Sequence, residues 1–319
     1  MSEHSLLLRI PATTANLGPG FDCLGMALNI WSELEVEQSP NLEFILEGEG
    51  FDSLPKNKSN VVYKALETVF SEQNMQVPGL KLRYNNAIPL SRGLGSSAAA
   101  IVAGLYAANI LLGKPENKSQ LLQKAAGIEG HADNVAPALF GGCQVVFREE
   151  KKLFHCRIPL GLKLNIILFI PDFPMPTDRG RAILKPLVER GDAVYNLSRV
   201  ALLATGLSTG KLEYLKFGTQ DRLHQPSRQE LFPAMGIIFR AALSAGASAV
   251  FLSGSGSTIL AMCQDNGEII GKAMLRAGKQ QGLKAKVVFT TPTSKGVHLV
   301  NHKNAETPIG SLPVNRTQN

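Results

Sequence analysis

The chain has 319 residues, of which 44% are hydrophobic and 18% are charged, and its mean hydropathy is +0.03. These values are typical of a globular protein and exclude a charged disordered chain, a collagen-like repeat and a coiled coil. The length exceeds the usual ~100 to 200 residues of one domain, so we expect one large or two modest domains. The longest nearly apolar run, residues 98–112, is shorter than the ~18 to 20 residues of a membrane span, so no transmembrane helix is predicted.

The net charge and the cysteines indicate which kind of ligand and which cellular compartment to expect. The net charge is +7, but the basic residues are scattered and aromatic residues are only 6% of the chain. We therefore expect an anionic small molecule as ligand, and no nucleic acid. The four cysteines show no C-x-x-C spacing, which predicts reduced thiols without structural zinc. No signal peptide is visible near the N-terminus, so we expect a cytoplasmic protein.

The first half of the chain reads as strands and turns that are interrupted by helices. Strands are predicted over residues 6–10, 33–37, 42–46, 80–84 and 143–147. Helices are predicted over residues 60–70, 96–112 and 115–129. The third of these helices would have Pro115 in its first turn and Gly130 just beyond its end.

The second half mixes helices and strands. The uninterrupted apolar run at residues 163–170 predicts a strand buried on both faces, and we place a domain boundary just before it. Helices over 181–188 and 192–204 and strands over 249–252, 259–262 and 284–289 follow. This order predicts an α+β fold, with domains at 1–160 and 161–303 and a disordered tail at 304–319.

The most informative segment is PLSRGLGSSAA at residues 89–99, where two glycines and two serines lead into a long helix. The first turn of a helix has unpaired N–H groups and a partial positive charge, so such a loop can hold phosphate oxygens. A tight turn that uses the glycines for positive φ explains the segment equally well. The loop lacks the lysine of a P-loop, and no following strand ending in an acid supports a dinucleotide site.

Two further glycine-rich segments lie near the ends of the chain. PATTANLGPGFDCLG at residues 11–25 carries Asn16 and Asp22 among small residues. These side chains could approach a ligand or could bond their own backbone, which is the commoner use. SGSGST at residues 253–258 would be an ordinary hairpin turn if it stood alone.

Taken together, the three segments resemble the GHMP kinase superfamily. They spell P-x-x-x-A-N-L-G-P-G-F-D, P-x-x-x-G-L-G-S-S-A-A and L-S-G-S-G-S-T in that order. The resemblance covers residues 11 to about 290, and within the superfamily it is strongest to the branch that phosphorylates homoserine. It implies a GHMP kinase fold, with a ribosomal S5 domain 2-like N-terminal domain, a ferredoxin-like C-terminal domain, and ATP between them.

The resemblance also implies which residues hold the nucleotide. The second motif would wrap the phosphates, and the hydroxyl of Ser97 and the carboxylate of Glu129 would be the ligands of Mg²⁺, which prefers oxygen. Asn60 is a weaker candidate for contact with adenine, because its position also suits a plain helix cap. The nucleotide-binding residues expected on this basis are Pro89, Leu90, Ser91, Arg92, Gly93, Leu94, Gly95, Ser96, Ser97, Ala98, Ala99 and Asn60.

The acceptor side is expected around EGHADNVAPALFGG, residues 129–142. A histidine near a helix end more often interacts with the helix dipole than with a substrate, but the resemblance favours the substrate. Asp133 or His131 could act as the general base, unless positioning and electrostatics suffice without one. The substrate-binding residues implied by the resemblance are Asn16, Asp22, His131, Asp133, Thr177, Arg181 and Arg228.

Two arginines distinguish the predicted substrate. Arg181 in PTDRGRAILKP and Arg228 in HQPSRQELFP match family elements that would hold an α-carboxylate, which suits the planar guanidinium. The expected reaction is phosphorylation of the γ-hydroxyl of L-homoserine by ATP, on the way to threonine, by a homodimer. The alternatives are another GHMP kinase of the mevalonate or sugar type, and a non-catalytic nucleotide- or RNA-binding module.

Overall fold

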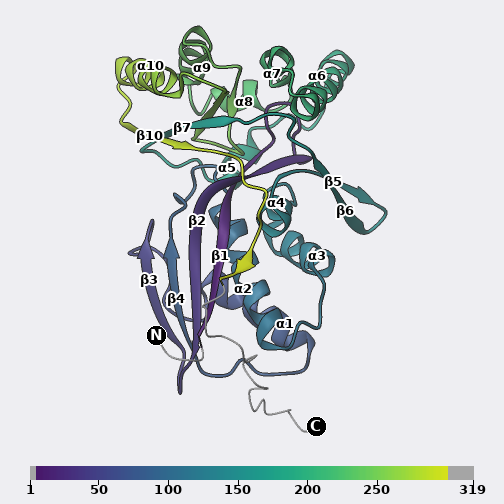
Figure 1. Ribbon diagram of the computed structural model, residues 1–319, viewed down its shortest axis with the longest axis vertical. Coiled ribbons are helices and arrows are strands. Elements are labelled where there is room, and N and C mark those ends of the chain that lie inside the picture. Colours follow the sequence, from purple (N-terminus) through teal and green to yellow (C-terminus); the bar gives the residue numbers. More distant parts are fainter. Residues whose placement is uncertain (1–4, 301–319) are drawn as a thin grey trace.

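The structure is a computed structural model that describes residues 5–300. Two sheets with their helices follow one another along the long axis of the molecule (Figure 1). The predicted tail at residues 304–319 lies outside the described residues.

The first sheet contains seven strands and is built around two long neighbours, β1 (Leu6–Ala15) and β2 (Leu24–Gln38). The order along it is β11-β1-β2-β4-β3, and β5 pairs with both β2 and β6. Among the strand pairs of this sheet within residues 5–300, β3–β4 is parallel and the others are antiparallel. The remaining strands are β3 (Glu43–Gly48), β4 (Leu80–Asn86), β5 (Cys143–Glu149), β6 (Lys152–Ile158) and β11 (His298–Leu299).

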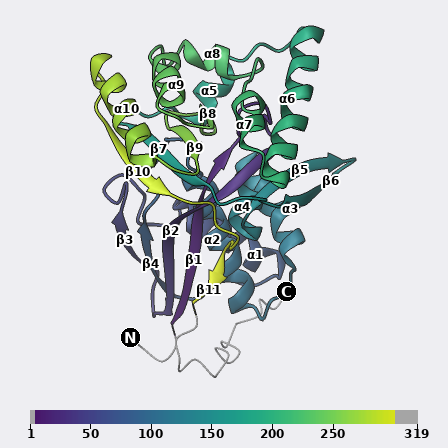
Figure 2. The ribbon, with the colours of Figure 1, turned by 45° about the horizontal axis from the view of Figure 1, so that its top comes forward.

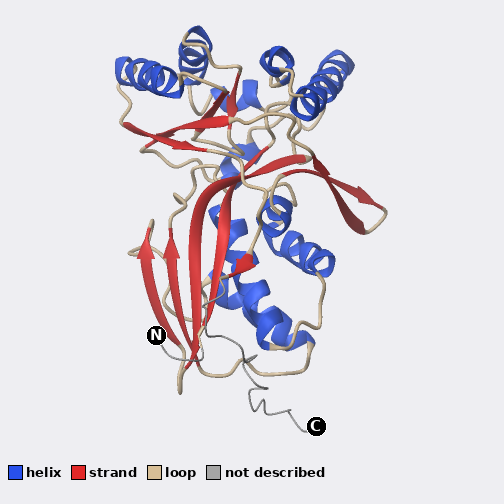
Figure 3. Cartoon of the chain, viewed as in Figure 1, coloured by secondary structure: helices blue, strands red, loops and turns tan. Residues whose placement is uncertain are grey.

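Four helices cover one face of this sheet (Figure 3). They are α1 (Val61–Glu72), α2 (Ser96–Leu111), α3 (Lys118–Glu129) and α4 (Val135–Phe140). The middle helix, α2, is rich in alanine and apolar residues around its whole circumference, and most of its residues are buried. A helix that is apolar on all sides belongs in a core, so α2 fixes the position of the loop that precedes it.

The second sheet is antiparallel and has the order β10-β7-β9-β8. Its strands are β7 (Asn165–Pro171), β8 (Ala249–Leu252), β9 (Ile259–Cys263) and β10 (Ala285–Thr290), and they are joined through α9 (Met235–Ser244) and α10 (Gly267–Gln280). This β-α-β-β-α-β arrangement is the ferredoxin-like one. Every residue of β7 after Asn165 is buried, as its uninterrupted apolar sequence predicts.

Four more helices precede α9 in the chain. In Figure 2, α6 and α7 lie above β5 and β6, and α5 and α8 lie closer to β8 and α9. They are α5 (Thr177–Ala182), α6 (Arg190–Thr209), α7 (Leu212–Gly218) and α8 (Gln225–Gln229). After β10 the chain returns to the first sheet, where β11 pairs with β1. From Thr291 on, the chain lies along the first sheet, through backbone bonds to β2 and then through β11, although the predicted second domain extends to residue 303.

Two helix predictions need correction. The helix predicted over 115–129 begins at Lys118, because Asn117 and Gln120 form a reciprocal capping box that sets its start. The helix predicted over 181–188 is wrong: α5 ends at Ala182. Lys185 precedes Pro186, and the residue before a proline is disfavoured in the α region. The prediction also lacked α4, β6, α7, α8, α9, α10 and β11.

Two expectations from the sequence concern the state of the cysteines and membrane-spanning helices. The four cysteines, all in the described part of the chain, are free thiols. Among residues 5–300, no helix is long and apolar enough to cross a membrane.

Candidate active site

The loop before α2 is built so that other chain segments can touch its backbone. Gly93 has φ +72 and Gly95 has φ +71, a region that favours glycine. A Cβ on Gly93 would lie 2.0 Å from the carbonyl oxygen of Ser253, and one on Gly95 would lie 2.0 Å from Oγ1 of Thr13. The two glycines thus serve both the backbone conformation and the close approach of their neighbours.

The N-terminus of α2 is open to an anion. Gly95 is its N-cap, makes no side-chain capping bond, and no acidic residue lies in the first turn. The first backbone N–H groups of a helix have no partner within the helix, and their partial positive charge favours a phosphate group. Gly95, Ser96 and Ser97 line a cavity of about 120 Å³ at this point.

The third glycine-rich segment joins the other two. The hydroxyl of Ser253 donates to the carbonyl of Gly93 at 2.6 Å and lies 2.8 Å from the hydroxyl of Thr14. The N–H of Gly254 donates to the carbonyl of Ala15 at 3.1 Å, and the N–H of Thr258 donates to that of Arg92. The turn between β8 and β9 therefore fixes the loop before α2 to the first motif.

Arg92 is part of this loop, but its side chain points to the protein. Its guanidinium donates to the carbonyl oxygens of Pro171 at 2.9 Å, Leu90 at 3.1 Å and Asp172. These carbonyls accept three of the five N–H donors of the guanidinium. The side chain holds the loop against the end of β7, and Arg92 also lines the cavity.

Ser97 and Glu129 lie together at the edge of the cavity. The hydroxyl of Ser97 donates to Oε2 of Glu129 at 2.7 Å. Burial raises the pKa of Glu129, and the bond from Ser97 partly offsets that increase. Among the described residues, no group of three or more His, Cys, Asp and Glu side chains could hold a metal ion. A metal at this pair would therefore take its other ligands from phosphate oxygens and water, a donor set that fits Mg²⁺.

His131 stands between two carboxylates in the turn from α3 to α4. Its Nδ1 lies 2.8 Å from Oδ1 of Asp133, and its Nε2 lies 3.8 Å from Oε1 of Glu129. Burial lowers the pKa of His131, but the bond to Asp133 and the two negative charges outweigh it, so the pKa is raised. Oδ1 of Asp133 also accepts from the N–H of Asn134 at 2.9 Å, which fixes the orientation of this carboxylate.

The first motif places a carboxylate against an arginine. Arg181 donates to both oxygens of Asp22, at 2.9 and 2.6 Å. This bidentate pair, its charge included, raises the pKa of Arg181. The side chains of both residues remain more than a third exposed, at 36% and 38%. Thr177 lies four residues before Arg181 on α5, hence on the same face of that helix.

The side chain of Asn16 serves the loop in which it lies. Its Oδ1 accepts from the N–H of Asp22 at 3.1 Å, and its Nδ2 donates to the carbonyl of Gly254 at 3.0 Å. Asn16 and Asp22 both have positive φ, which asparagine and aspartate tolerate better than most residues. The loop is therefore held by its own amide, as the alternative drawn from the sequence suggests, while Asn16 also lines the cavity.

Arg228 is the second arginine of the site and is almost completely buried, at 2% exposed. Its Nε donates to the carbonyl of Gly180 at 3.2 Å, and its Nη1 donates to the carbonyl of Gly254 at 2.9 Å. Burial and the neighbouring charge of Arg181 lower the pKa of Arg228 to about 10. The side chain still carries its charge at neutral pH, facing the cavity.

The structure brings most of the predicted residues to one cavity, but not all of them. Leu90 lines a neighbouring cavity of about 710 Å³, and Ala98 and Ala99 are buried in the core. Asn60 caps α1 through Val62, donates to the carbonyl of Pro55, and lines neither cavity. The cavity of about 120 Å³ is lined by the predicted residues Asn16, Asp22, Pro89, Ser91, Arg92, Gly93, Leu94, Gly95, Ser96, Ser97, Glu129, His131, Asp133, Thr177, Arg181 and Arg228.

Comparison with known proteins shows the family. Residues 60–142 match the model of the GHMP kinases N terminal domain, and residues 207–280 match that of the GHMP kinases C terminal. The homoserine kinase of Moorella thermoacetica is 42% identical over 294 residues, which cover 92% of this chain and 99% of that protein. The chain belongs to the homoserine kinase family of the GHMP kinases.

Solved structures agree with this membership. The homoserine kinase from Cytophaga hutchinsonii superposes with a TM-score of 0.84 at 31% identity, covering 94% of this chain and 98% of that one. The mevalonate kinase of L. major superposes with a TM-score of 0.68 at 16% identity, covering 90% and 96%. The second likeness shows the fold alone. The prediction of a GHMP kinase fold is confirmed.

Sequence reasoning missed several residues that build the site of this homoserine kinase family member. Oγ1 of Thr13 donates to Oδ1 of Asn134 at 2.8 Å, which joins β1 to the turn that carries His131. Asn134 and Ser255 also line the cavity. His224 lies behind it and contacts Arg228. The one signal for His224 is its spacing, since it stands four residues before Arg228.

Proposed function

We propose that the protein transfers the γ-phosphoryl group of ATP to the γ-hydroxyl of L-homoserine, giving O-phospho-L-homoserine and ADP, a step toward threonine. The observation that carries this proposal is one cavity with two chemically different walls. One wall is the uncapped N-terminus of α2, and the other holds Asp22, Arg181 and Arg228.

The wall at α2 suits the phosphates of ATP. The backbone N–H groups of its first turn are available to oxygen, and Gly93 and Gly95 let the chain approach a ligand without a side chain between them. ATP is the phosphoryl donor of GHMP kinases as a family. Phosphoryl transfer needs little covalent help from protein, so positioning and charge neutralisation carry most of the rate enhancement.

Ser97 and Glu129 are the residues that would hold Mg²⁺. Their oxygens already lie within 2.7 Å of one another. The ion would neutralise charge on the phosphates. Burial raises the pKa of Glu129, and a bound cation would stabilise the carboxylate and lower that pKa again.

The opposite wall suits the two charges of an amino acid. Arg181 and Asp22 already satisfy one another as a bidentate ion pair. The carboxylate of a zwitterion can take the place of Asp22 on the arginine, and its ammonium can bind the aspartate, so neither charge is left unpaired. Arg228 adds a second positive charge on the carboxylate side, and Asn16, Thr177 and His131 supply polar contacts.

Asp133 is our candidate for the general base. Its carboxylate is held by His131 and by the N–H of Asn134 through one oxygen, Oδ1. The other oxygen can accept the proton of the γ-hydroxyl as that hydroxyl attacks. His131, whose pKa is raised, is better suited to orient Asp133 and to balance its charge than to remove the proton.

The nearest rival is a GHMP kinase that acts on mevalonate or a sugar. Mevalonate carries a carboxylate but no ammonium, and a sugar carries neither. Mevalonate could take the place of Asp22 on Arg181 but would offer the aspartate no ammonium, and a sugar would leave the pair of Asp22 and Arg181 without a charged ligand. The charged wall therefore favours an amino acid.

A coupled assay of ADP release tests the function. Mg·ATP is offered with L-homoserine, L-serine, L-threonine, mevalonate or galactose, and a reaction without metal serves as control. We expect turnover with L-homoserine far above that with the other acceptors, and none without metal. Preferred turnover of mevalonate or galactose would keep the phosphate site and overturn the acceptor assignment.

Two properties of the protein in the cell go with this proposal. Its use of ATP and of a free amino acid suits the cytoplasm. The homodimer implied by the family resemblance stays a prediction, and sedimentation equilibrium of the purified chain would test it.

A further inference from the structure

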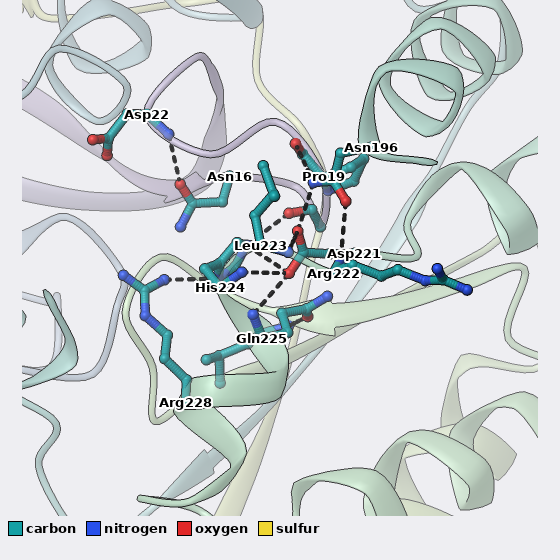
Figure 4. A network of polar contacts seen from close by, with 12 residues as sticks. Asn16, Pro19, Asp22, Asn196, Asp221, Arg222, Leu223, His224, Gln225 and Arg228 are labelled. Atoms are coloured by element: carbon teal, nitrogen blue, oxygen red, sulfur yellow. Dashed lines mark hydrogen bonds and ion pairs between the residues drawn. The ribbon is translucent and has the colours of Figure 1, made fainter. Parts of the chain in front are cut away.

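A buried polar network lies directly behind the acceptor wall (Figure 4). His224, at 0% exposed, stands just before α8 and between two parts of the site. Its Nε2 lies 2.7 Å from the carbonyl oxygen of Gly18, and its Nδ1 lies 2.9 Å from Nη1 of Arg228. One imidazole therefore connects the first motif to the buried arginine.

The chemistry of these two partners fixes the tautomer of the imidazole. A carbonyl oxygen can only accept and a guanidinium can only donate. Nε2 must therefore carry the proton that is given to Gly18, and Nδ1 must offer its lone pair to Arg228. A protonated imidazole would turn an N–H toward the arginine and break the second contact. Burial lowers the pKa of His224 to about 4, so the neutral form prevails at neutral pH.

Asp221 holds the histidine in place from the other side. Its buried carboxylate accepts from the backbone N–H groups of Leu223 and His224 at 3.0 Å each and of Gln225 at 2.7 Å. It also accepts from Nδ2 of Asn196 at 2.7 Å, and that amide reaches the carbonyl of Pro19. The carboxylate thus orders the turn before α8 and ties it to α6 and to the first motif.

The ring of Phe21 completes the connection. It stacks on His224 with the ring centroids 5.4 Å apart. The guanidinium groups of Arg181 and Arg228 each lie 5.5 Å from its centroid. Phe21 is the residue before Asp22, so a shift of the imidazole would move the loop that carries Asp22 as well as both arginines.

We propose that His224, held by Asp221, is a positioning residue for the acceptor, which keeps Arg228 and the loop of Asn16 and Asp22 in register with one another. The proposal rests on the proposed function, because it takes Arg228 to bind the carboxylate of the acceptor. His224 touches neither substrate. If the lone pair on Nδ1 of His224 is removed, Nη1 of Arg228 loses one of its two buried acceptors. If the N–H on Nε2 is removed, the carbonyl of Gly18 loses its donor.

Three substitutions of His224 separate its two contacts. His224→Phe keeps the ring beside Phe21 and removes both hydrogen bonds. His224→Asn places an amide oxygen near the position of Nδ1 and keeps an acceptor for Arg228, while His224→Gln places an amide N–H near the position of Nε2 and keeps a donor for Gly18. His155→Phe is the matched control, because His155 is half-buried, stacks on Phe140 at 3.7 Å and bonds Gln144 at 3.1 Å, away from the cavity.

Steady-state kinetics with L-homoserine and Mg·ATP give the decisive comparison. We expect His224→Phe to raise the KM for homoserine about 10- to 100-fold, in line with one lost hydrogen bond to a charged group, with the KM for ATP within about twofold. His224→Asn should recover most of that loss and His224→Gln less, and His155→Phe should match the wild type. A double-mutant cycle with Arg228→Ala adds a second readout: in that background His224→Phe should have little further effect on the KM for homoserine.

The outcomes that overturn the proposal are distinct from failure of the proposed function. Turnover of homoserine by the wild type tests that function, and if another acceptor is turned over instead, the same variants are measured with it. An unchanged acceptor KM in folded His224→Phe, an equal rise in both KM values, or additive effects in the cycle would each contradict the positioning role. Thermal melting and binding of Mg·ATP establish that each variant is folded.

Discussion

The two walls of the cavity differ in the chemical groups that they present. The wall that faces the phosphates is mostly backbone: Gly93 and Gly95 bring main-chain atoms forward, and α2 begins without a side-chain cap. The wall that faces the acceptor is made of charged side chains. Its buried arginine, Arg228, donates to two carbonyls from distant segments and contacts the imidazole of His224 at the start of its own helix. A site built from backbone needs glycine at fixed places, whereas a site built from side chains depends on what lies behind it.

The largest effect is expected from Asp133→Asn, which keeps the shape of the acceptor wall and removes its basic oxygen. If Asp133 accepts the proton of the γ-hydroxyl, kcat should fall by about 10²- to 10⁴-fold, with little change in the KM for ATP. Single-turnover kinetics in a quenched-flow instrument would isolate the chemical step. A kcat within about tenfold of the wild type would favour transfer without a protein base.

The substitution Gly95→Ala tests the phosphate wall. The added Cβ would lie 2.0 Å from Oγ1 of Thr13, so the loop must shift, and a misplacement of about 1 Å can cost about 100-fold in rate. We expect kcat/KM for ATP to fall by about that factor.

Gly113→Ala is the control for this substitution. Gly113 has φ +77, and a Cβ added there would meet no atom within 4 Å, so it carries the same conformational cost without the collision. Its unfolding free energy should drop by about 1 kcal/mol with kcat/KM unchanged. If the two variants lost activity equally, the loss would follow from placing alanine at a positive φ. The close approach of Thr13 to Gly95 would then not be its cause.

The two histidines of the acceptor side should respond to pH in opposite directions. The pKa of His131 is raised, so its contribution to stability is full below the ordinary value of about 6.5 and is lost as the pH rises through the raised pKa. The pKa of His224 is lowered to about 4, so stability is lost as the pH falls from about 6.5 toward 4.

Urea unfolding across this pH range would measure both effects. The difference in unfolding free energy between wild type and His131→Gln should shrink with increasing pH, and the difference between wild type and His224→Gln should shrink with decreasing pH. Parallel curves for either variant would contradict the assigned protonation states.

The sequence predicts the features that depend on local backbone patterns better than those that depend on contacts between distant side chains. The glycine-rich entry to α2 and the buried strand β7 could be located from the sequence, because both are local patterns. The phosphate role of the loop came from the family resemblance. The termination of α5 was missed although Lys185 and Pro186 signal it locally. The contact of His224 with Gly18 joins residues 206 positions apart, and no local pattern predicts such a pair. Arg181 and Arg228 were assigned through family resemblance, since an arginine by itself looks like an ordinary surface charge.

The contacts of Arg92 could not be predicted from its charge and its place in the sequence. The sequence shows a basic residue inside a glycine-rich loop, but it does not show that three donors of this residue face the carbonyls of Leu90, Pro171 and Asp172. Those carbonyls belong in part to the end of β7, whose position depends on the packing of the second sheet.

The measurement that tests the account most directly is the effect of Arg181→Ala on the two KM values. Loss of a bidentate, charge-assisted contact should raise the KM for L-homoserine on the order of 100-fold, with the KM for ATP within about twofold of the wild type. Arg179→Ala, on the same short helix and exposed, should leave both unchanged. An equal rise in both KM values, or no rise for homoserine, would contradict the division of the cavity into a phosphate wall and an amino-acid wall.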